Sequence, residues 1–137
     1  MGNTVVAISP DSKALYHAAA VMVSNQIVAL ADMGTALLVK CGFSEAAAAE
    51  ALSPLLLGNA QSVAEKGAVN ALTGPIERGD AQTVSKHLQE IRKFAAESTV
   101  GQDILTAYTA LSKQLIRIAQ QKHPHKDYKH LEKELEQ

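Results

Sequence analysis

The sequence predicts an all-α protein, a helical bundle with long central helices, on two observations. Hydrophobic residues make up 47% of the 137 residues, but aromatic residues only 4%, and tryptophan is absent. The apolar share depends on alanine and leucine, which favour helices, whereas strands prefer β-branched and aromatic residues. Long apolar segments at helical spacing alternate with glycine and proline breaks. One domain is the expectation at this length.

The first ten residues form a different kind of segment. Residues 4–8, TVVAI, are a short β-like run with no comparable strand elsewhere in the chain. A single strand cannot satisfy its own backbone groups, so residues 1–10 are predicted to be the remnant of an interdomain linker. Ser9, Pro10 and Asp11 then predict the start of a helix.

A long helix is predicted over residues 12–40. Apolar residues cover more than one of its faces, so more than one face should be buried. At 1.5 Å per residue it would be about 40 Å long, more than the width of a small domain. Part of it should therefore be covered by a partner chain or an absent domain. Gly42 is predicted to end it as a C-cap glycine.

Two shorter helices should follow. Ser44 is predicted to cap a helix over residues 45–52, whose alanines allow close approach of another backbone. Ser53 and Pro54 are predicted to restart a second helix that continues to Gly67.

Two amphipathic helices are predicted in the second half. Asp80 should cap the first of them, and the turn at residues 97–99 leads into the second, which Pro124 ends. Residues 11–121 are thus predicted to form one all-helical domain. Residues 122–137 should be a charged C-terminal tail in solvent. The three histidines of this region match no zinc pattern, so no metal site is predicted: His123, His125 and His130.

Composition excludes several classes of function. A net charge of -1 leaves no basic surplus for nucleic acid. The single Cys41 cannot form an internal disulfide, which indicates a reducing cytoplasm. Polar residues from Ser24 to Gln26, and Asp32, interrupt the longest apolar run, so no membrane span is predicted. No glycine-rich phosphate loop is present, so the chain should have no cofactor-binding half of its own.

The candidate functional loop is Asn70–Asp80, NALTGPIERGD. Asn70, Thr73 and Arg78 have side chains that can hold a carboxylate or phosphate, and arginine can make a two-pronged contact. In the alternative interpretation, Arg78 pairs with Glu77 or Asp80, Asp80 only caps a helix, and Gly74-Pro75 is only a turn. His87 either reaches back toward the loop or is a half-buried structural histidine.

A second group of candidates lies on the first predicted helix. His17 and Ser24 are seven residues apart and nearly eclipsed, with Asn25 and Asp32 continuing the polar line. In the functional interpretation, His17 and Asn25 line a cleft as a hydrogen-bond donor and a proton-transfer group. In the alternative, each side chain satisfies a backbone group or faces a partner.

Four segments together resemble a known family: Lys13–Asn25 (KALYHAAAVMVSN), Pro54-Leu55-Leu56, Asn70–Asp80 and His87-Leu88. They are similar to the C-terminal helical domain of the Rossmann-like, domain of unknown function 2520 family. That family is related to pyrroline-5-carboxylate reductase and to the 6-phosphogluconate dehydrogenase C-terminal-like superfamily. The similarity covers residues 4–119.

The resemblance implies a bundle of the 6-phosphogluconate dehydrogenase C-terminal-like type. It implies the dimerisation and substrate-side domain of an NAD(P)-dependent oxidoreductase, a homodimer that binds NADP or NAD mainly through an N-terminal domain this chain lacks. The substrate would be a small molecule, with a carboxylate as one candidate group. Enzymatic activity would require the missing domain. The alternative is a non-catalytic helical dimerisation or interaction module.

The resemblance also implies roles for six residues. Three would take part in catalysis: His17, Asn25 and Thr73. Three would bind substrate: Asn70, Arg78 and His87.

Overall fold

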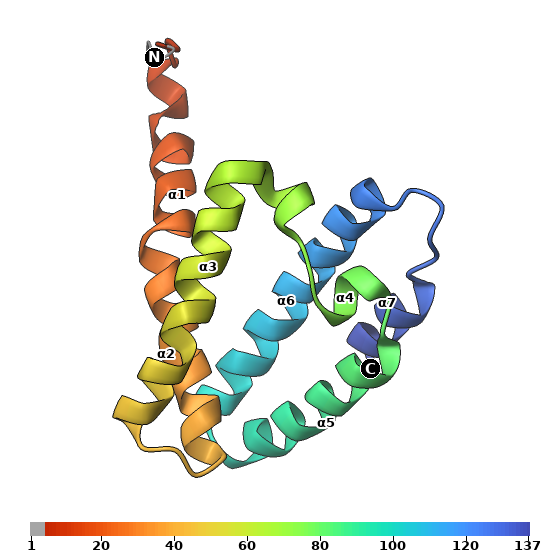
Figure 1. Cartoon of the computed structure of the whole chain (residues 1–137). Helices are drawn as coiled ribbons and strands as arrows, with labels where there is room; N and C mark the ends of the chain where they lie inside the picture. The colour runs from red at the N-terminus through yellow and green to blue at the C-terminus, as the bar shows by residue number, and fades with distance from the viewer. Residues whose placement is uncertain (1–4) are drawn as a thin grey trace. The chain divides into compact units, whose positions relative to one another are not determined.

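The computed structural model describes residues 5–137, which are all-α as predicted (Figure 1). The chain divides into two compact units, one ending at Ser53 and one beginning at Pro54, and each is described by itself. The elements are η1 (Pro10–Ser12), α1 (Lys13–Val23), α2 (Asn25–Lys40), α3 (Glu45–Ala71), α4 (Pro75–Arg78), α5 (Ala81–Glu97), α6 (Thr99–Lys122) and α7 (Lys129–Glu136).

The start of the chain carries no strand in the part that the structure describes. Val5 to Ser9 have neither helix nor strand, and Val5 and Val6 are exposed. Among the described residues this β-like run therefore has no partner strand, as expected from the sequence. Its origin as the remnant of an interdomain linker stays a prediction. Thr4 lies outside the described residues.

The predicted single helix over residues 12–40 is two helices, α1 and α2, divided at Ser24 (φ -115°, ψ -70°). The Ser24 hydroxyl donates to the Ala20 carbonyl at 2.6 Å and to Asn25 Oδ1 at 3.0 Å. A serine side chain that bonds its own backbone in this way competes with the helix and bends it. The hydrogen bond to Ala20 agrees with the alternative in which Ser24 satisfies a backbone group, but the division of the helix there was not predicted.

The turn between α2 and α3 has the predicted chemistry. Gly42 has a positive φ of 99°, a conformation that glycine adopts without strain, and it ends α2. Ser44 Oγ accepts a hydrogen bond from the Ala47 amide at 3.2 Å and so caps α3. Both predictions are confirmed.

The predicted division of α3 at Pro54 is wrong. The helix continues through Pro54, because the alanines and leucines around it are strong helix formers that outweigh one lost hydrogen bond. The irregular residue is Gly67 (φ 75°, ψ 164°), which is the predicted end of this segment, so the structure confirms the break there. Asn70 still belongs to α3, so the connection to the next helix is short.

The predicted loop contains a one-turn helix, α4. Gly74 (φ 99°) precedes it and Gly79 (φ 73°) ends it in the left-handed conformation. Asp80 then caps α5 as predicted, since its carboxylate accepts from the Thr83 amide at 3.0 Å and the Thr83 hydroxyl at 2.7 Å.

The second unit holds the hydrophobic core. Helices α5 and α6 run antiparallel along one another, and α4 and α7 pack against both (Figure 1). At the α5–α6 turn Gly101 approaches so closely that a β-carbon would collide with the carbonyl oxygen of Phe94. The core residues come from α4 through α7 and the segment before each: Leu72, Ile76, Val84, Leu88, Ile116, Ala119, Tyr128, Leu131 and Leu135.

The prediction of a solvated C-terminal tail is also wrong. Residues 129–136 form α7, and its Leu131 and Leu135 are buried together with Tyr128. The spacing of these three side chains, i, i+3 and i+7, places them on one face of a helix. Burial of that face against α5 and α6 outweighs the charge of the other faces.

The stretch Pro10–Lys40 is long and apolar enough to cross a membrane by length and composition, with a mean hydropathy of 1.4. The polar residues within it are too few to lower the mean hydropathy below the limit for a membrane-spanning helix, so the prediction that no segment spans a membrane stays a prediction. Core helices of soluble proteins and signal sequences meet the same test.

Candidate functional site

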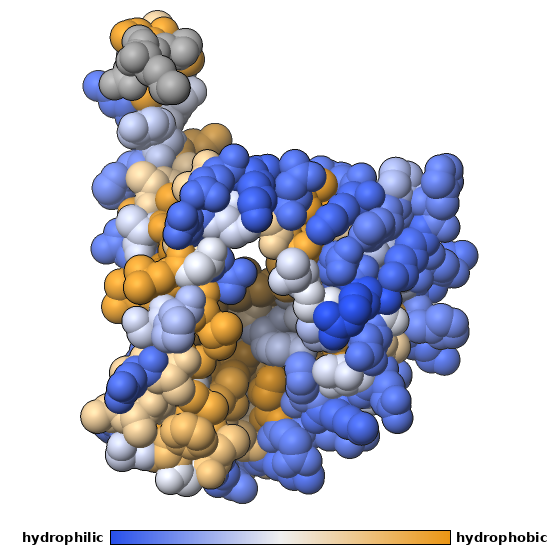
Figure 2. Space-filling model, in the orientation of Figure 1, coloured by the Kyte–Doolittle hydropathy of each residue, from blue (hydrophilic) through white to orange (hydrophobic). Residues whose placement is uncertain are grey.

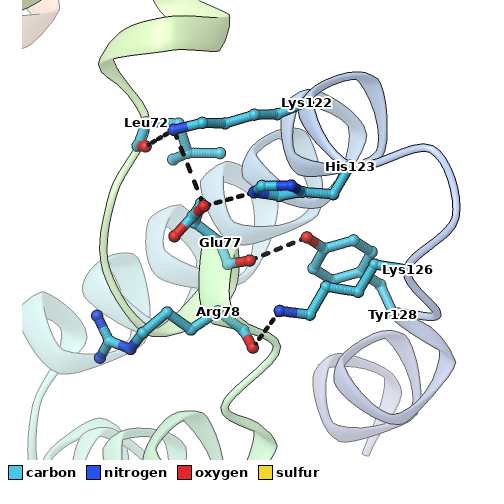
Figure 3. A network of polar contacts seen from close by, with 7 residues as sticks. All are labelled: Leu72, Glu77, Arg78, Lys122, His123, Lys126 and Tyr128. Atoms are coloured by element: carbon cyan, nitrogen blue, oxygen red, sulfur yellow. Dashed lines mark hydrogen bonds and ion pairs between the residues drawn. The ribbon is translucent and has the colours of Figure 1, made fainter.

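A network of polar contacts surrounds Glu77 on α4 (Figure 3). His123 Nε2 lies 2.5 Å from Glu77 Oε1, and Lys122 Nζ lies 3.8 Å from the same oxygen. Because an ionised carboxylate can only accept, His123 must donate through Nε2 in this contact. The network thus joins the predicted functional loop to the C-terminal end of α6.

Three side chains of the C-terminal region, Lys122 among them, also donate hydrogen bonds to the backbone of the loop. Lys122 Nζ donates to the Leu72 carbonyl at 2.8 Å, Lys126 Nζ to the Arg78 carbonyl at 2.6 Å, and the Tyr128 hydroxyl to the Glu77 carbonyl at 2.9 Å. Each bond spans about fifty residues of sequence. Short helices leave their carbonyls without internal partners, and these donors satisfy three carbonyls in and beside α4.

These contacts change the acid–base properties of the site. The hydrogen bond from His123 lowers the pKa of Glu77, and the charge of Lys122 lowers it further. The pKa of Tyr128 is raised, mainly because burial disfavours the phenolate and also because Glu77 is negative. Glu77 is therefore held ionised and Tyr128 held as a neutral donor.

An apolar groove lies beside this network within the second unit. Its volume is about 340 Å³, at the lower end of the usual range for small-molecule sites. Its lining comes from α3, the segment after it, and α6: Asn59, Val63, Ala68, Ala71, Leu72, Thr73, Leu115 and Ile118. Leu72 joins the two features, because its side chain lines the groove while its carbonyl binds Lys122.

A second polar contact connects α5 and α6. His87 Nδ1 lies 2.9 Å from the Tyr108 hydroxyl, and the two rings meet edge to face. Burial raises the pKa of Tyr108, while a hydrogen bond with buried Ser112 opposes the shift. This row of three hydroxyl and imidazole groups leads from the helix interface to the surface.

The structure brings some of the predicted residues together and not others. Thr73 lines the groove, and Asn70 lies at the end of α3, where its amide donates to the Lys66 carbonyl at 3.1 Å. The guanidinium of Arg78 extends away from the Glu77 network (Figure 3). The pKa of Asp80 is lowered mainly by its two hydrogen bonds from Thr83, and the charge of Arg78 lowers it further. His87 contacts Tyr108 and not the loop.

His17 and Asn25 belong to the first unit. His17 is exposed on α1, and Asn25 is exposed at the start of α2, where it accepts the Ser24 hydroxyl. Their roles, like those of the other four predicted residues, stay predictions.

Sequence reasoning missed the C-terminal partners of the loop: Lys122, His123, Lys126 and Tyr128. One of the two interpretations paired Arg78 with Glu77 or Asp80, both local contacts, whereas His123 and Lys122 lie some 46 residues from Glu77. One signal was available, namely the helical spacing of Tyr128, Leu131 and Leu135, which predicts an amphipathic helix in the tail. Nothing in the sequence places that helix against the loop.

The arrangement can position a ligand and exchange protons, through the carboxylate–imidazole pair and the phenol–imidazole pair. Within residues 5–137 no group of three or more His, Cys, Asp or Glu side chains is arranged to hold a metal ion.

Comparison with known proteins gives one match. No curated protein and no solved structure matches the chain. A family model with the description "Domain of unknown function (DUF2520)" matches residues 1–115. This range includes both predicted site segments and ends within α6, before the C-terminal partners of Glu77. Since the match covers well over half of the 137 residues, the chain belongs to the DUF2520 family.

Proposed function

We propose that the chain is the dimerisation and substrate-side domain of an NAD(P)-dependent oxidoreductase whose substrate is not established. Its NADP or NAD would be bound mainly by a nucleotide-binding domain outside these residues. The resemblance to the relatives of pyrroline-5-carboxylate reductase and the 6-phosphogluconate dehydrogenase C-terminal-like type supports this proposal. The absence of a glycine-rich dinucleotide loop from the 137 residues fits it.

One observation carries the dimerisation part of the proposal: the apolar faces of α1 and α2 are exposed. Figure 2 shows apolar side chains gathered over these helices, whereas the visible face of α5 to α7 is mostly hydrophilic. The exposed apolar residues of the two helices are Leu15, Tyr16, Met22, Val23, Val28, Leu30 and Val39. Burying one large apolar side chain contributes about 1.5–3 kcal/mol, so a second copy that covers this face would be held strongly.

The groove and the loop support the substrate-side part. Thr73 supplies a hydroxyl at the groove wall, and the Arg78 guanidinium is directed away from its own network (Figure 3). A guanidinium binds carboxylates in a two-pronged contact. Arg78 does not line the groove itself, so the guanidinium supports a carboxylate-bearing small molecule and the groove supports an apolar one. The exposed, single Cys41 fits a cytoplasmic location.

Sedimentation velocity tests the dimer. The wild type is expected to sediment as a dimer, and the Met22→Lys/Val28→Lys double variant as a monomer, because two charges enter the apolar face. The control is Gln26→Lys, which places a charge at an exposed polar position of α2. This variant should remain dimeric. A wild-type monomer at every concentration, or partition of the wild type into lipid vesicles, would contradict the proposal.

A thermal-shift screen of small carboxylic acids tests the substrate side. We expect at least one acid to raise the melting temperature of the wild type and of Arg117→Ala, and to leave Arg78→Ala unchanged. Arg117 is an exposed arginine of α6 in the same unit and so controls for loss of one positive charge. Dimerisation without any response to the acids would favour the non-catalytic interaction module.

A further inference from the structure

We infer that the C-terminal clasp, defined as residues 122–136, fixes the conformation of the candidate loop and so positions its side chains. The clasp comprises the last residue of α6, the connection to α7, and α7 itself. It lies outside residues 1–115, which the family model matches, whereas the loop that it holds lies inside them. The inference about the loop is independent of the proposed function; only its consequence for ligand binding rests on that function.

The first step is that the clasp is anchored in the core. Tyr128, Leu131 and Leu135 are exposed by 2%, 1% and 5%, and they belong to the same hydrophobic cluster as Leu72 and Ile76 of the loop. A segment so buried does not detach without opening the core. The clasp is therefore a fixed support and not a loose tail.

The second step is that the clasp binds the backbone of the loop and not only its side chains. Its three donors reach the carbonyls of Leu72, Glu77 and Arg78 (Figure 3). Backbone contacts leave the side chains of Thr73 and Arg78 available for a ligand. Contacts at both ends of the loop restrict its backbone at both ends.

The third step is a close fit at Gly79, where the loop turns. A β-carbon at Gly79 would lie 3.1 Å from Lys126 Cε, and the φ of 73° is one that residues with a β-carbon rarely adopt. Lys126 Nζ also lies 5.9 Å from the centre of the Tyr128 ring, which favours the position that the ammonium takes. The turn at Gly79 and the side chain of Lys126 therefore pack closely against each other, with little space for a β-carbon between them.

Amide hydrogen exchange on the whole chain tests this inference. The reporters are the Arg78, Gly79 and Asp80 amides, which donate to the Gly74, Ile76 and Pro75 carbonyls. The Tyr128→Phe/Lys126→Met variant removes two donors and keeps the buried ring in the core. We expect the reporters to exchange about two- to tenfold faster in this variant, the range that corresponds to the loss of such hydrogen bonds.

Two further variants make the test specific. Lys133→Met removes an exposed ammonium from α7, away from the loop contacts, and should leave the reporter amides at the wild-type rate. The single variant Lys126→Arg, in which Tyr128 is unchanged, retains a donor and should keep most of the protection of the wild type. Unchanged reporter rates in the double variant would overturn the inference. An equal acceleration of every amide in α5 and α6 would also overturn it, because it would show only a loss of global stability.

The outcome is separable from the proposed function. A loop that loosens while no carboxylic acid binds would retain the clasp and reject the substrate side. If the loop amides stay protected in the double variant while acids bind through Arg78, the inference about the clasp is rejected and the substrate-side proposal is retained.

Discussion

Helices α1 and α2 of the first unit and the core helices α4 to α7 of the second differ in how they bury large apolar side chains. In the first unit, Leu15 on α1 is exposed by 75% and Val28 on α2 by 69%. Among the described residues of this unit, Ala48 alone is a buried apolar residue. On α3, Leu55, Leu57 and Val63 of the second unit are exposed as well. In the second unit, Leu88 and Ile116 are exposed by only 1% and 2%. The more apolar helices, α1 and α2, thus leave an uncovered face, whereas the less apolar helices α5 and α6 close a core.

This difference shows that burial depends on how the apolar residues are arranged around a helix, since the less apolar helices are the ones that close a core. Helices α5 and α6 each carry a single apolar stripe, which the other helix and α7 cover. Helices α1 and α2 are apolar on several sides, and one neighbouring helix cannot cover them all. The core of α4 to α7 should therefore be stable by itself, whereas α1 and α2 need an additional surface to cover them.

The largest expected effect is a contrast in amide exchange between the units. In dilute solution, amides in the middle of α6 should exchange at least about 100-fold more slowly than those of α1, because they open only with the core. Raising the protein concentration should slow exchange in α1 and leave α6 unchanged. Equal protection of both helices at high dilution would remove the contrast.

The next effect is on the free energy of unfolding of the second unit. Leu88→Ala should lower it by about 2–5 kcal/mol, because it leaves a cavity in a closed core. Leu15→Ala, on the exposed face of the first unit, should change the free energy of unfolding of that unit by less than about 0.5 kcal/mol in the dilute protein. Urea titrations of the two variants measure both values, and similar losses would mean that Leu15 is packed.

A smaller effect is expected from two glycines in different settings. Gly101→Ala should destabilise the chain by about 1–3 kcal/mol, because the new β-carbon collides with the Phe94 carbonyl and separates α5 from α6. Gly58→Ala, in the helical part of α3 where nothing lies within 4 Å, should instead stabilise it by up to about 1 kcal/mol. Thermal unfolding of the two variants gives the signs, and a neutral Gly101→Ala would show that the α5–α6 turn is loose.

The smallest effect concerns acid. The pKa of Glu77 is lowered from 4.5 in the folded chain, so its contribution to stability is present above about pH 4.5 and is lost as the pH falls through the folded value. Glu77→Gln should remove this part of the acid response. Glu90→Gln, on the exposed surface of α5, should keep it. Melting temperatures between pH 3 and 6 compare the three proteins; identical acid limbs for wild type and Glu77→Gln would mean that the His123 contact contributes nothing.

The sequence predicted local chemistry well. The caps at Ser44 and Asp80, the turn glycine at Gly42, and the apolar stripes of α5 and α6 follow from residue type and spacing within a few positions. Those features depend on hydrogen bonds and packing between near neighbours. The same local reasoning failed at Ser24 and Pro54, where two local preferences compete and their balance decides whether the helix continues.

By itself, the sequence determined the all-α class, the helix caps and the position of the candidate loop, because these depend on neighbours along the chain. Only the tertiary structure decided that Glu77 binds His123 and Lys122 instead of Arg78, and that the charged C-terminal residues form a buried helix. The physical reason is distance in sequence. Side chains some fifty positions apart meet only after the core has closed, and no local pattern specifies which of several charged residues each will contact.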